Sequence, residues 1–543
     1  MNTLAKKTWV RAGLALTAAT ALFGLGACSN TGAGGQAGPS ETAGEIDMPM
    51  EQDGPHAPAD REVAAPKASD SADGKSTVVE VDLGNVLAGD YSAPLRGQVI
   101  VPKQADAPTP LVVVSHLRAP NCTDTTFAYP CADGAQENRY DRGMVYLGEA
   151  LAAQGYAVVI PDLGGVFVGA DVTDPYDQNQ MWKDAVGQLV GALNEDAAKE
   201  TLGTELAAPV DLTRVGLVLH SRSGTLIEPA IELFGEGNVK GAFAYGPAYD
   251  TFDLASITPA PADVAYLALV GEADADVGTS ANLWVGHYLD KARTQPAAVV
   301  AVPGLGHMWV NRTASTAGTD DRIGCDERDC PDAAEHERVM IEVATDWLGA
   351  TVRGAETTLP VSAAHKLPAT VAGLQARWLA HTPGALVSLQ PGDFKAVSGQ
   401  SAVECVNPDP MSPVAVDNAC PAPENGVVQI VTPVNYLTDA KAELEVAGAK
   451  GVALHVAPSG TYDGPGTALR VRLGLKDGSE FEFGVEATDQ AVVNRASDLD
   501  NGVYLLGTVR VELPEAVAGQ TITSVQVTSE QHPVELRGVD FWK

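Results

Sequence analysis

The chain has 543 residues, of which 70 are acidic and 35 are basic, so its formal net charge at pH 7 is −35. A charge of this sign excludes binding to the phosphate backbone of nucleic acids, which requires a basic surface. A strongly negative surface keeps a protein soluble. The length is too great for a single hydrophobic core, so we expect more than one domain.

Residues 1–27 are predicted to be a signal peptide, because three basic residues precede an uncharged stretch too short to span a membrane. The stretch ends in Leu-Gly-Ala-Cys28, which resembles the lipobox of bacterial lipoproteins. The resemblance implies that Cys28 carries a lipid and anchors the chain at the extracytoplasmic face of the cell membrane. An ordinary signal peptide with an accidental Cys28 is the alternative.

Residues 28–78 consist mainly of Gly, Ala, Pro, Ser, Asp and Glu. Such a stretch cannot bury enough apolar surface to offset the entropy lost on ordering, so we expect a disordered acidic tether. No later segment has the run of apolar residues that a second membrane span needs.

Seven cysteines are present. If Cys28 is lipidated, the even number that remains favours disulfide bonds in an exported chain. Metal binding is the weaker interpretation, because no pair of CxxC units occurs. The expected local pairs are Cys122 with Cys131, Cys325 with Cys330, and Cys405 with Cys420.

Residues 79–354 are predicted to form an α/β domain, because short Val-rich runs alternate with helical patterns. Runs that are apolar throughout are typical of parallel strands with helices on both faces of the sheet. The predicted strands are 111–115, 157–160, 215–219, 265–270 and 298–302, and the predicted helices are 143–154, 181–193, 225–234 and 335–348.

Residues 355–394 are predicted to be a connector and residues 395–543 a smaller all-β sandwich. Apolar and polar residues alternate there, as in strands with one solvated face. The final strands weakly resemble those of carbohydrate-binding jelly rolls, which implies a possible glycan contact. Without a clear row of exposed aromatic residues, packing against the preceding domain is favoured.

The segment 214–225 carries the strongest functional pattern. A predicted buried strand leads into Ser221 and a helix follows, which is the context of a nucleophile elbow. The sequence His-Ser221-Arg-Ser-Gly is similar to the Gly-His-Ser-Arg-Gly-Gly motif of dienelactone-hydrolase-like, chlorophyllase-like and polyester-hydrolase-like esterases. This resemblance implies an α/β-hydrolase fold with Ser221 as the nucleophile.

Two positions depart from that motif. Leu219 and Ser223 stand where the family has glycine, and a large side chain at position 219 is expected to crowd the turn. Centring the elbow on Ser223 is one alternative. A strand-to-helix turn without any nucleophile is another.

The family order of serine, acid and histidine continues downstream. A predicted strand ends in Gly-x-x-Asp274, with Asp276 as a nearby substitute, and a second one leads through a Pro-Gly turn to Gly306-His307. In these roles His307 accepts the proton of Ser221, while Asp274 fixes the tautomer of the imidazole ring.

The oxyanion hole needs two preorganised backbone donors. The amide of Arg222 is one candidate. The other lies in the loop 113–120, which resembles a Ser-His-Gly-x segment of the same esterases, with His116 matching. We expect the amide of Arg118 there, with that of Leu117 as the second choice, and the Cys122–Cys131 bond would rigidify the adjoining loop.

His116, Tyr176, Asn179 and Trp182 are candidates for a substrate pocket, because ligands bind at the carboxyl ends of strands in open sheets. Ordinary packing is the alternative for each. The acidic run 320–329 lacks the ligand spacing of a calcium loop, so we expect a solvated, disulfide-stapled loop, without a metal or cofactor.

Together these features predict an extracytoplasmic, lipid-anchored serine hydrolase that cleaves small or polymeric carboxylic esters through an acyl-enzyme. A serine peptidase is the alternative on the same fold, since fold does not choose substrate. From a different class, the chain could be a non-catalytic cell-surface binding lipoprotein with a degenerate hydrolase core, for which Leu219 is the main support.

Overall fold

The computed structural model describes residues 54–168, 176–250, 258–325, 329–407, 432–458, 466–493 and 505–543. The predicted signal peptide, Cys28 and the Cys405–Cys420 bond therefore lie outside what is described here. All of the described residues belong to one compact unit. Among the described residues, no helix is long and apolar enough to cross a membrane.

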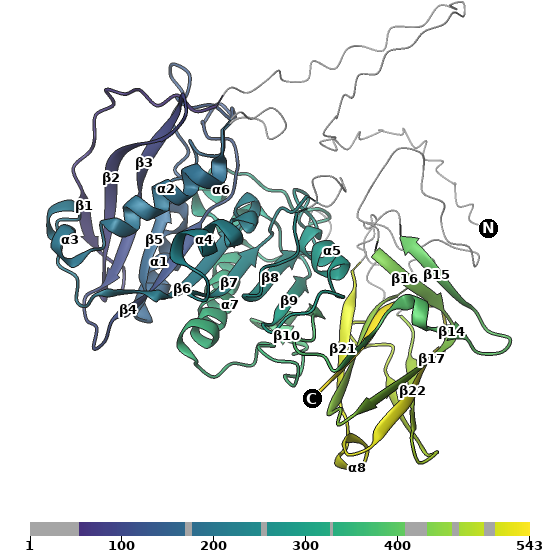
Figure 1. The fold of residues 1–543 in the computed structure, drawn as a ribbon. Helices are drawn as coiled ribbons and strands as arrows, with labels where there is room; N and C mark the ends of the chain where they lie inside the picture. Colours follow the sequence, from purple (N-terminus) through teal and green to yellow (C-terminus); the bar gives the residue numbers. More distant parts are fainter. Residues whose placement is uncertain are drawn as a thin grey trace, which may run out of the picture. The chain divides into compact units, whose positions relative to one another are not determined.

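One ten-stranded sheet forms the first part of this unit (Figure 1). In sheet order the strands are β1 (Lys67–Asp70), β2 (Ser76–Ala88), β3 (Tyr91–Pro102), β5 (Ala157–Pro161), β4 (Thr109–Ser115), β6 (Val210–His220), β7 (Val239–Tyr245), β8 (Ala265–Gly271), β9 (Ala297–Val302) and β12 (Arg377–Ala380). The six strands β4 to β9 are parallel to one another, whereas β1, β2, β3 and β12 pair antiparallel with their neighbours.

Helices cover both faces of this sheet, which confirms the predicted α/β class. Every residue of β4, β5, β8 and β9 is buried, as expected for strands packed on both faces. The helices are η1 (Arg142–Met144), α1 (Val145–Ala153), α2 (Gln178–Gly191), α3 (Glu195–Thr201), η2 (Ser221–Leu226), α4 (Ile227–Phe234), α5 (Ser280–His287), η3 (Met308–Val310), α6 (Arg312–Thr316) and α7 (Ala333–Arg353).

Two hydrophobic cores lie on opposite faces of the sheet. Residues of α2, α4 and α5 pack in one core, and residues of α1 and α7 pack in the other. Strand β6 contributes to both, with Leu217 and Leu219 in the first core and Val218 in the second. The indole of Trp347 also donates to Ala242 O of β7 at 3.0 Å, which ties α7 to the sheet.

The strand order reverses at β4. The chain passes from β4 to β5 on one side, and β6 then lies on the other side of β4. In open α/β sheets, ligands bind in the crevice at the carboxyl ends of the strands beside such a switch point. The loops after β4 and β6 are therefore where a site is expected.

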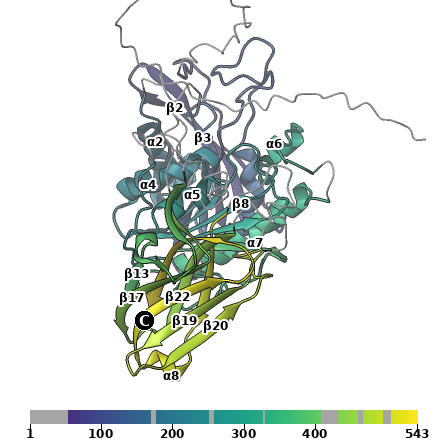
Figure 2. The same ribbon diagram turned by 90° about the vertical axis from the view of Figure 1, so that its right-hand side faces the viewer.

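The C-terminal region is β-rich, as predicted, and its two main sheets share one hydrophobic core. Figure 2 shows β17, β22, β19 and β20 side by side. The elements are β10 (Thr370–Val371), β11 (Leu374–Gln375), β13 (Val387–Leu389), η4 (Pro391–Asp393), β14 (Lys395–Ala396), β15 (Ala402–Asn407), β16 (Thr432–Leu437), β17 (Asp439–Ala447), β18 (Gly451–Pro458), β19 (Leu469–Leu475), β20 (Glu480–Val485), β21 (Gly507–Glu512), α8 (Glu515–Ala518), β22 (Thr521–Ser529) and β23 (Val534–Trp542).

The predicted tether extends too far along the chain. From residue 54 onwards the backbone is part of the compact unit, and β1 pairs with β2 although all of its side chains are exposed. Arg61 forms an ion pair with Asp82 at 2.7 Å. The tether prediction rested on low hydrophobicity, whereas this segment is held by backbone hydrogen bonds and a charge pair, which composition does not reveal.

The predicted connector 355–394 is not an irregular link, because it contributes strands to the ten-stranded sheet and to the C-terminal sheet that contains β23. Strand β12 pairs with β9, and β13 pairs with β23.

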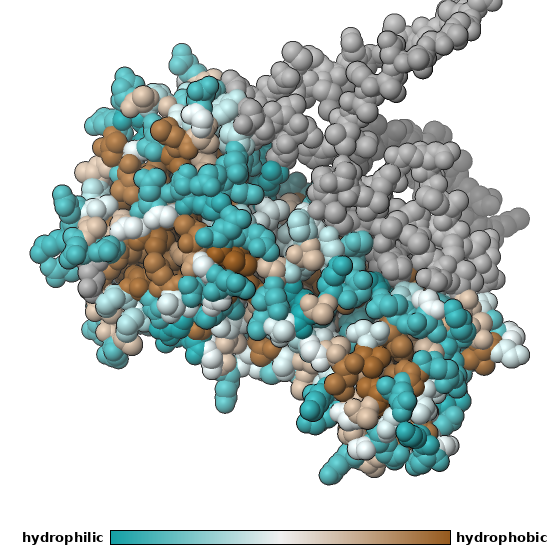
Figure 3. Space-filling model, in the orientation of Figure 1, coloured by the Kyte–Doolittle hydropathy of each residue, from teal (hydrophilic) through white to brown (hydrophobic). Residues whose placement is uncertain are grey.

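In the view of Figure 3, the described surface is largely hydrophilic with separate apolar patches, in keeping with the acidic composition.

A buried arginine joins the C-terminal strands to the α/β part. Arg537 of β23 donates to Gly286 O at 3.0 Å and to His287 O at 3.2 Å, at the end of α5. Its third bond, at 2.9 Å, reaches Gln390 Oε1. The two regions therefore pack through polar contacts of a fully buried cation, in agreement with the favoured packing role.

Replacing Arg537 by Met should lower the free energy of unfolding by about 2–3 kcal/mol, because buried carbonyl groups then lose a charged donor. Thermal unfolding followed by circular dichroism measures the change. The matched control is Arg470→Met, since Arg470 forms an exposed ion pair with Glu530. An unchanged melting midpoint for Arg537→Met would contradict the inference that the hydrogen bonds of Arg537 hold the two regions together.

Candidate active site

Ser221 occupies a strained turn at the carboxyl end of β6. Its φ is +58°, a left-handed conformation that costs a non-glycine residue about 1–2 kcal/mol. The strand ends at His220, η2 begins at Ser221 and α4 follows. This strand-turn-helix geometry is the one that the predicted nucleophile elbow requires.

Leu219 does not crowd this turn, contrary to the expectation from the sequence. Its side chain is fully buried in the core beside α2 and α4, on the face of β6 opposite to Val218. The close approach occurs at Gly224 instead, where a Cβ would lie 2.5 Å from the Cβ of Pro247. The residue that the turn requires to be glycine is therefore Gly224.

Ser223, the alternative nucleophile, has its hydroxyl engaged elsewhere. The side chain is fully buried, and its Oγ donates to the carbonyl oxygen of His116 at 2.6 Å. This bond joins the elbow to the loop that follows β4. The arrangement favours Ser221 over Ser223 as the reactive serine.

Asp274 and His307 form a buried hydrogen-bonded pair. His307 Nδ1 donates to Asp274 Oδ2 at 2.9 Å. The other oxygen, Oδ1, accepts three backbone amides of the turn after β8, those of Asp276 and Val277 at 2.9 Å and that of Gly278 at 3.2 Å. The turn therefore fixes the carboxylate, and the carboxylate fixes the orientation and tautomer of the imidazole ring.

The second nitrogen of His307 is buried and has no hydrogen-bond partner among the described residues. Asp276 Oδ2 lies 3.4 Å from this Nε2 as an ion-pair contact. Burial opposes charging of the ring, but the carboxylates of Asp274, Asp276 and Asp321 outweigh burial and raise the pKa of His307 to about 9. Asp276, predicted as a substitute for Asp274, thus faces the opposite side of the ring.

Several contacts hold the elbow against the Asp274–His307 pair. The rings of His220 and His307 are 4.9 Å apart, and His220 Nε2 donates to His307 O at 3.1 Å. Ser221 O accepts the amide of Ala248 at 3.0 Å. A Cβ at nearby Gly246 would lie 2.7 Å from His307 Nδ1. The segments that carry Ser221, Asp274 and His307 therefore meet at the same end of the sheet.

His116 is not a pocket residue. Its ring is fully buried, Nε2 accepts the amide of Leu163 at 2.8 Å, and Nδ1 donates to Leu117 O at 2.7 Å. Burial lowers the pKa of His116, so the ring is neutral. The ring supports the loop after β4 from beneath, which was the alternative interpretation of this residue.

The other pocket candidates are corrected in the same way. Trp182 is fully buried and donates to Ser115 Oγ at 3.0 Å, and Tyr176 is buried and donates to Val166 O at 2.8 Å. Both side chains belong to the hydrophobic core that includes α2 and the sheet. Asn179 lies exposed on α2.

The predicted oxyanion residues lie in the two expected loops. Arg222 directly follows Ser221, and its guanidinium donates to Gln178 Oε1 at 3.2 Å. Arg118 lies in the loop after β4, where its Nε donates to Phe167 O at 2.8 Å and its guanidinium stacks over Phe127 at 4.5 Å. These contacts fix the two side chains, while the amides of both residues remain the predicted donors.

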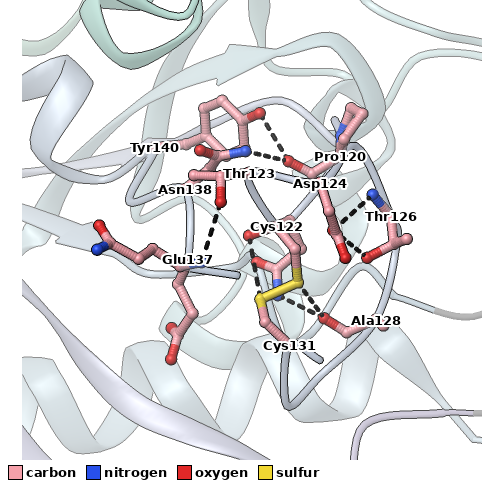
Figure 4. The surroundings of a disulfide bond; sticks show 12 residues. Pro120, Cys122, Thr123, Asp124, Thr126, Ala128, Cys131, Glu137, Asn138 and Tyr140 are labelled. Carbon is pink, nitrogen blue, oxygen red and sulfur yellow. Dashed lines mark hydrogen bonds between the residues drawn. A yellow bond between two sulfur atoms is a disulfide. The ribbon is translucent and has the colours of Figure 1, made fainter. Parts of the chain in front are cut away.

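The loop beyond Arg118 is closed by the Cys122–Cys131 disulfide (Figure 4). Pro120 O accepts a bond from Asn138 Nδ2 at 2.8 Å and another from the hydroxyl of Tyr140 at 2.9 Å. The second predicted disulfide, Cys325–Cys330, is also present. The local pairing expected from the sequence is thus found for both pairs that the structure describes.

Two residues that sequence reasoning missed hold the histidine loop. The hydroxyl of Tyr245 donates to Gly306 O at 2.7 Å. Asp321 accepts the backbone amides of His307 and Met308. No spacing pattern could reveal either, because each binds backbone groups that lie far away along the chain.

Within the described residues, no cluster of His, Cys, Asp and Glu has the arrangement needed to hold a metal ion.

Comparison with known proteins adds little at the level of sequence. No family model matches the chain, and no curated protein matches it. A solved structure named as a candidate dienelactone hydrolase, from Klebsiella pneumoniae subsp. pneumoniae, is similar to 50% of this chain over 98% of its own length. The sequence identity is 16% and the TM-score is 0.31, too distant a likeness to carry an argument about the site.

Proposed function

We propose that this chain is a serine hydrolase of the α/β-hydrolase type that cleaves carboxylic esters with Ser221, His307 and Asp274. The observation that carries the proposal is the buried His307–Asp274 pair, packed against the strained turn that bears Ser221. Among the described residues, the Nε2 of His307 has no hydrogen-bond partner. Chain order supports it, since serine, acid and histidine follow β6, β8 and β9 in turn.

In this mechanism the neutral Nε2 of His307 takes the proton of the Ser221 hydroxyl as the oxygen attacks the ester carbonyl. The backbone amides of Arg222 and Arg118 are assigned to the negative oxygen of the tetrahedral intermediate. The imidazolium then gives its proton to the leaving alcohol, which leaves an acyl group on Ser221. Water, activated by the same nitrogen, releases the acid and restores the serine.

Asp274 supplies the electrostatic part of the mechanism. Its Oδ2 holds the Nδ1 proton, so Nε2 is the nitrogen left to accept a proton. The three amides on Oδ1 keep the carboxylate in place as charge develops on the ring. The choice of esters over peptides rests on the esterase resemblance of the motif around Ser221.

We further propose an extracytoplasmic location with a lipid anchor at Cys28, supported by the Leu-Gly-Ala-Cys sequence that ends the apolar N-terminal stretch. The substrate would then be a small or polymeric ester outside the cell membrane. The contacts of Arg537 support a packing role for the C-terminal region in preference to glycan binding.

Ser221→Ala should lower the rate of p-nitrophenyl ester hydrolysis by roughly 10⁴-fold or more and abolish labelling by a fluorophosphonate, because the nucleophile is lost. Ser223→Ala is the matched control, and it should stay within about tenfold of the parent because it loses only one positioning hydrogen bond. Absence of labelling in the parent protein would favour the binding lipoprotein, and cleavage of peptides alone would favour the peptidase.

Hydrolysis should rise with pH through about 9, because Nε2 accepts a proton only when the imidazole is neutral and the pKa of His307 is raised to about 9. The pH dependence of kcat/KM measures this midpoint. Asp276→Asn removes one of the carboxylates that raise the pKa, so the midpoint should move to lower pH. A parent midpoint near the ordinary histidine value of about 6.5 would contradict the described charge arrangement.

Asp274→Asn should reduce kcat by roughly 10⁴-fold, because the ring loses its tautomer control. Asp276 cannot replace it, since this carboxylate lies at Nε2 and not at Nδ1. Steady-state kinetics of the folded variant provide the measurement. A loss of only a few fold would show that another group holds Nδ1.

A further inference from the structure

The stretch from Asp320 to Ile323, called the acidic segment below, contacts the loops that carry Asp274 and His307. Arg322 forms an isolated β-bridge with Asp274. The next residue, Ile323, donates its amide to Ala273 O at 2.8 Å. Backbone contacts therefore tie this segment to the turn that holds the Asp274 carboxylate.

Asp321 makes the corresponding contact with the histidine loop. Its Oδ2 accepts the amide of His307 at 2.7 Å, and its Oδ1 accepts the amide of Met308 at 3.0 Å. One carboxylate thus satisfies two consecutive backbone donors at the start of η3. Bonds between backbone amides and an ionised acceptor are among the stronger hydrogen bonds in proteins.

Gly306 permits this close approach. A Cβ at position 306 would lie 2.4 Å from the Cγ of Arg322 and 3.1 Å from Asp321 Oδ1. Any side chain there would push the acidic segment away from the histidine loop. The glycine that precedes His307 therefore serves the contact with Asp321.

The residues around Asp321 hold the segment in place. The guanidinium of Arg322 lies 3.5 Å from the ring centroid of Trp309, bonds to Asp320 at 2.8 Å and donates to Pro331 O at 2.7 Å. The Cys325–Cys330 disulfide begins two residues beyond Ile323. These contacts of Arg322 fix the backbone next to Asp321, so the Asp321 carboxylate is held in contact with the histidine loop.

We propose that Asp321 is a positioning residue of the hydrolase site, which sets the backbone of His307 so that its ring meets Asp274. The acidic segment then fixes the position of the His307–Asp274 pair, in addition to being part of the solvated, disulfide-stapled loop that the sequence predicts. This inference rests on the proposed function, because it assigns Asp321 to the same site.

Removing the charge of Asp321 should also change the pKa of His307. The titratable groups that face His307 are Asp274, Asp276, Asp321 and the neighbouring ring of His220, whose pKa burial holds well below the ordinary value. Asp321 is one of the carboxylates that raise the pKa of His307. Its neutralisation therefore lowers that pKa.

The test compares Asp321→Asn with Asp329→Asn in the full chain, using p-nitrophenyl esters as substrate. Asp321→Asn should lower kcat roughly 10–100-fold with KM within about twofold, and should move the pH midpoint of kcat/KM downward. Asp329→Asn removes an exposed carboxylate that makes none of the contacts described above, so it should keep the parent kcat and midpoint. Asp321→Glu restores the charge and should return the midpoint toward that of the parent.

A folded Asp321→Asn protein with the parent kcat and pH midpoint overturns the inference. If that variant does not fold, hydrogen exchange of the parent decides, since the amides of His307 and Met308 should be protected. Rapid exchange of both amides in the folded parent overturns the inference as well. A parent protein that neither hydrolyses esters nor reacts with a fluorophosphonate contradicts the proposed function instead, and the exchange result still tests the Asp321 contact.

Discussion

The parallel alignment of β6, β8 and β9 in one sheet is the constraint on which the candidate site depends. Parallel neighbours end at the same edge, so residues far apart in sequence are delivered to one place. Ser221, Asp274 and His307 each follow one of these strands. The two hydrophobic cores pack on opposite faces of the sheet, so the central strands are buried and the positions of their ends are fixed.

Much of the central sheet could be predicted, because its strands are local runs of apolar residues. The predicted strand 298–302 corresponds to β9, Ala297–Val302, and the predicted strand 265–270 to β8, Ala265–Gly271. The outer strands could not be predicted, because pairing between distant segments decides them. Strand β1 has no buried side chain, and β12 lies in a stretch without a strand pattern of its own.

For the site, the sequence predicts the reactive side chains better than the residues that surround them. The order of serine, acid and histidine is a sequence signal, and Asp274 and His307 are hydrogen-bonded as that order requires. A position beyond the carboxyl end of a strand does not separate a pocket wall from a core, so Trp182 is a pocket candidate from the sequence although it is fully buried. Asp321 was hidden because its partners are backbone amides, which every residue except proline possesses.

Strand β12 has a consequence for the autonomy of the α/β part. It covers β9, whose residues are apolar and buried throughout. A chain cut at residue 354 would lose this cover and expose a bare, apolar edge strand, which is a template for pairing with other molecules. The α/β part is therefore not a separable module, and an excised version would be prone to aggregate whatever the state of its catalytic residues.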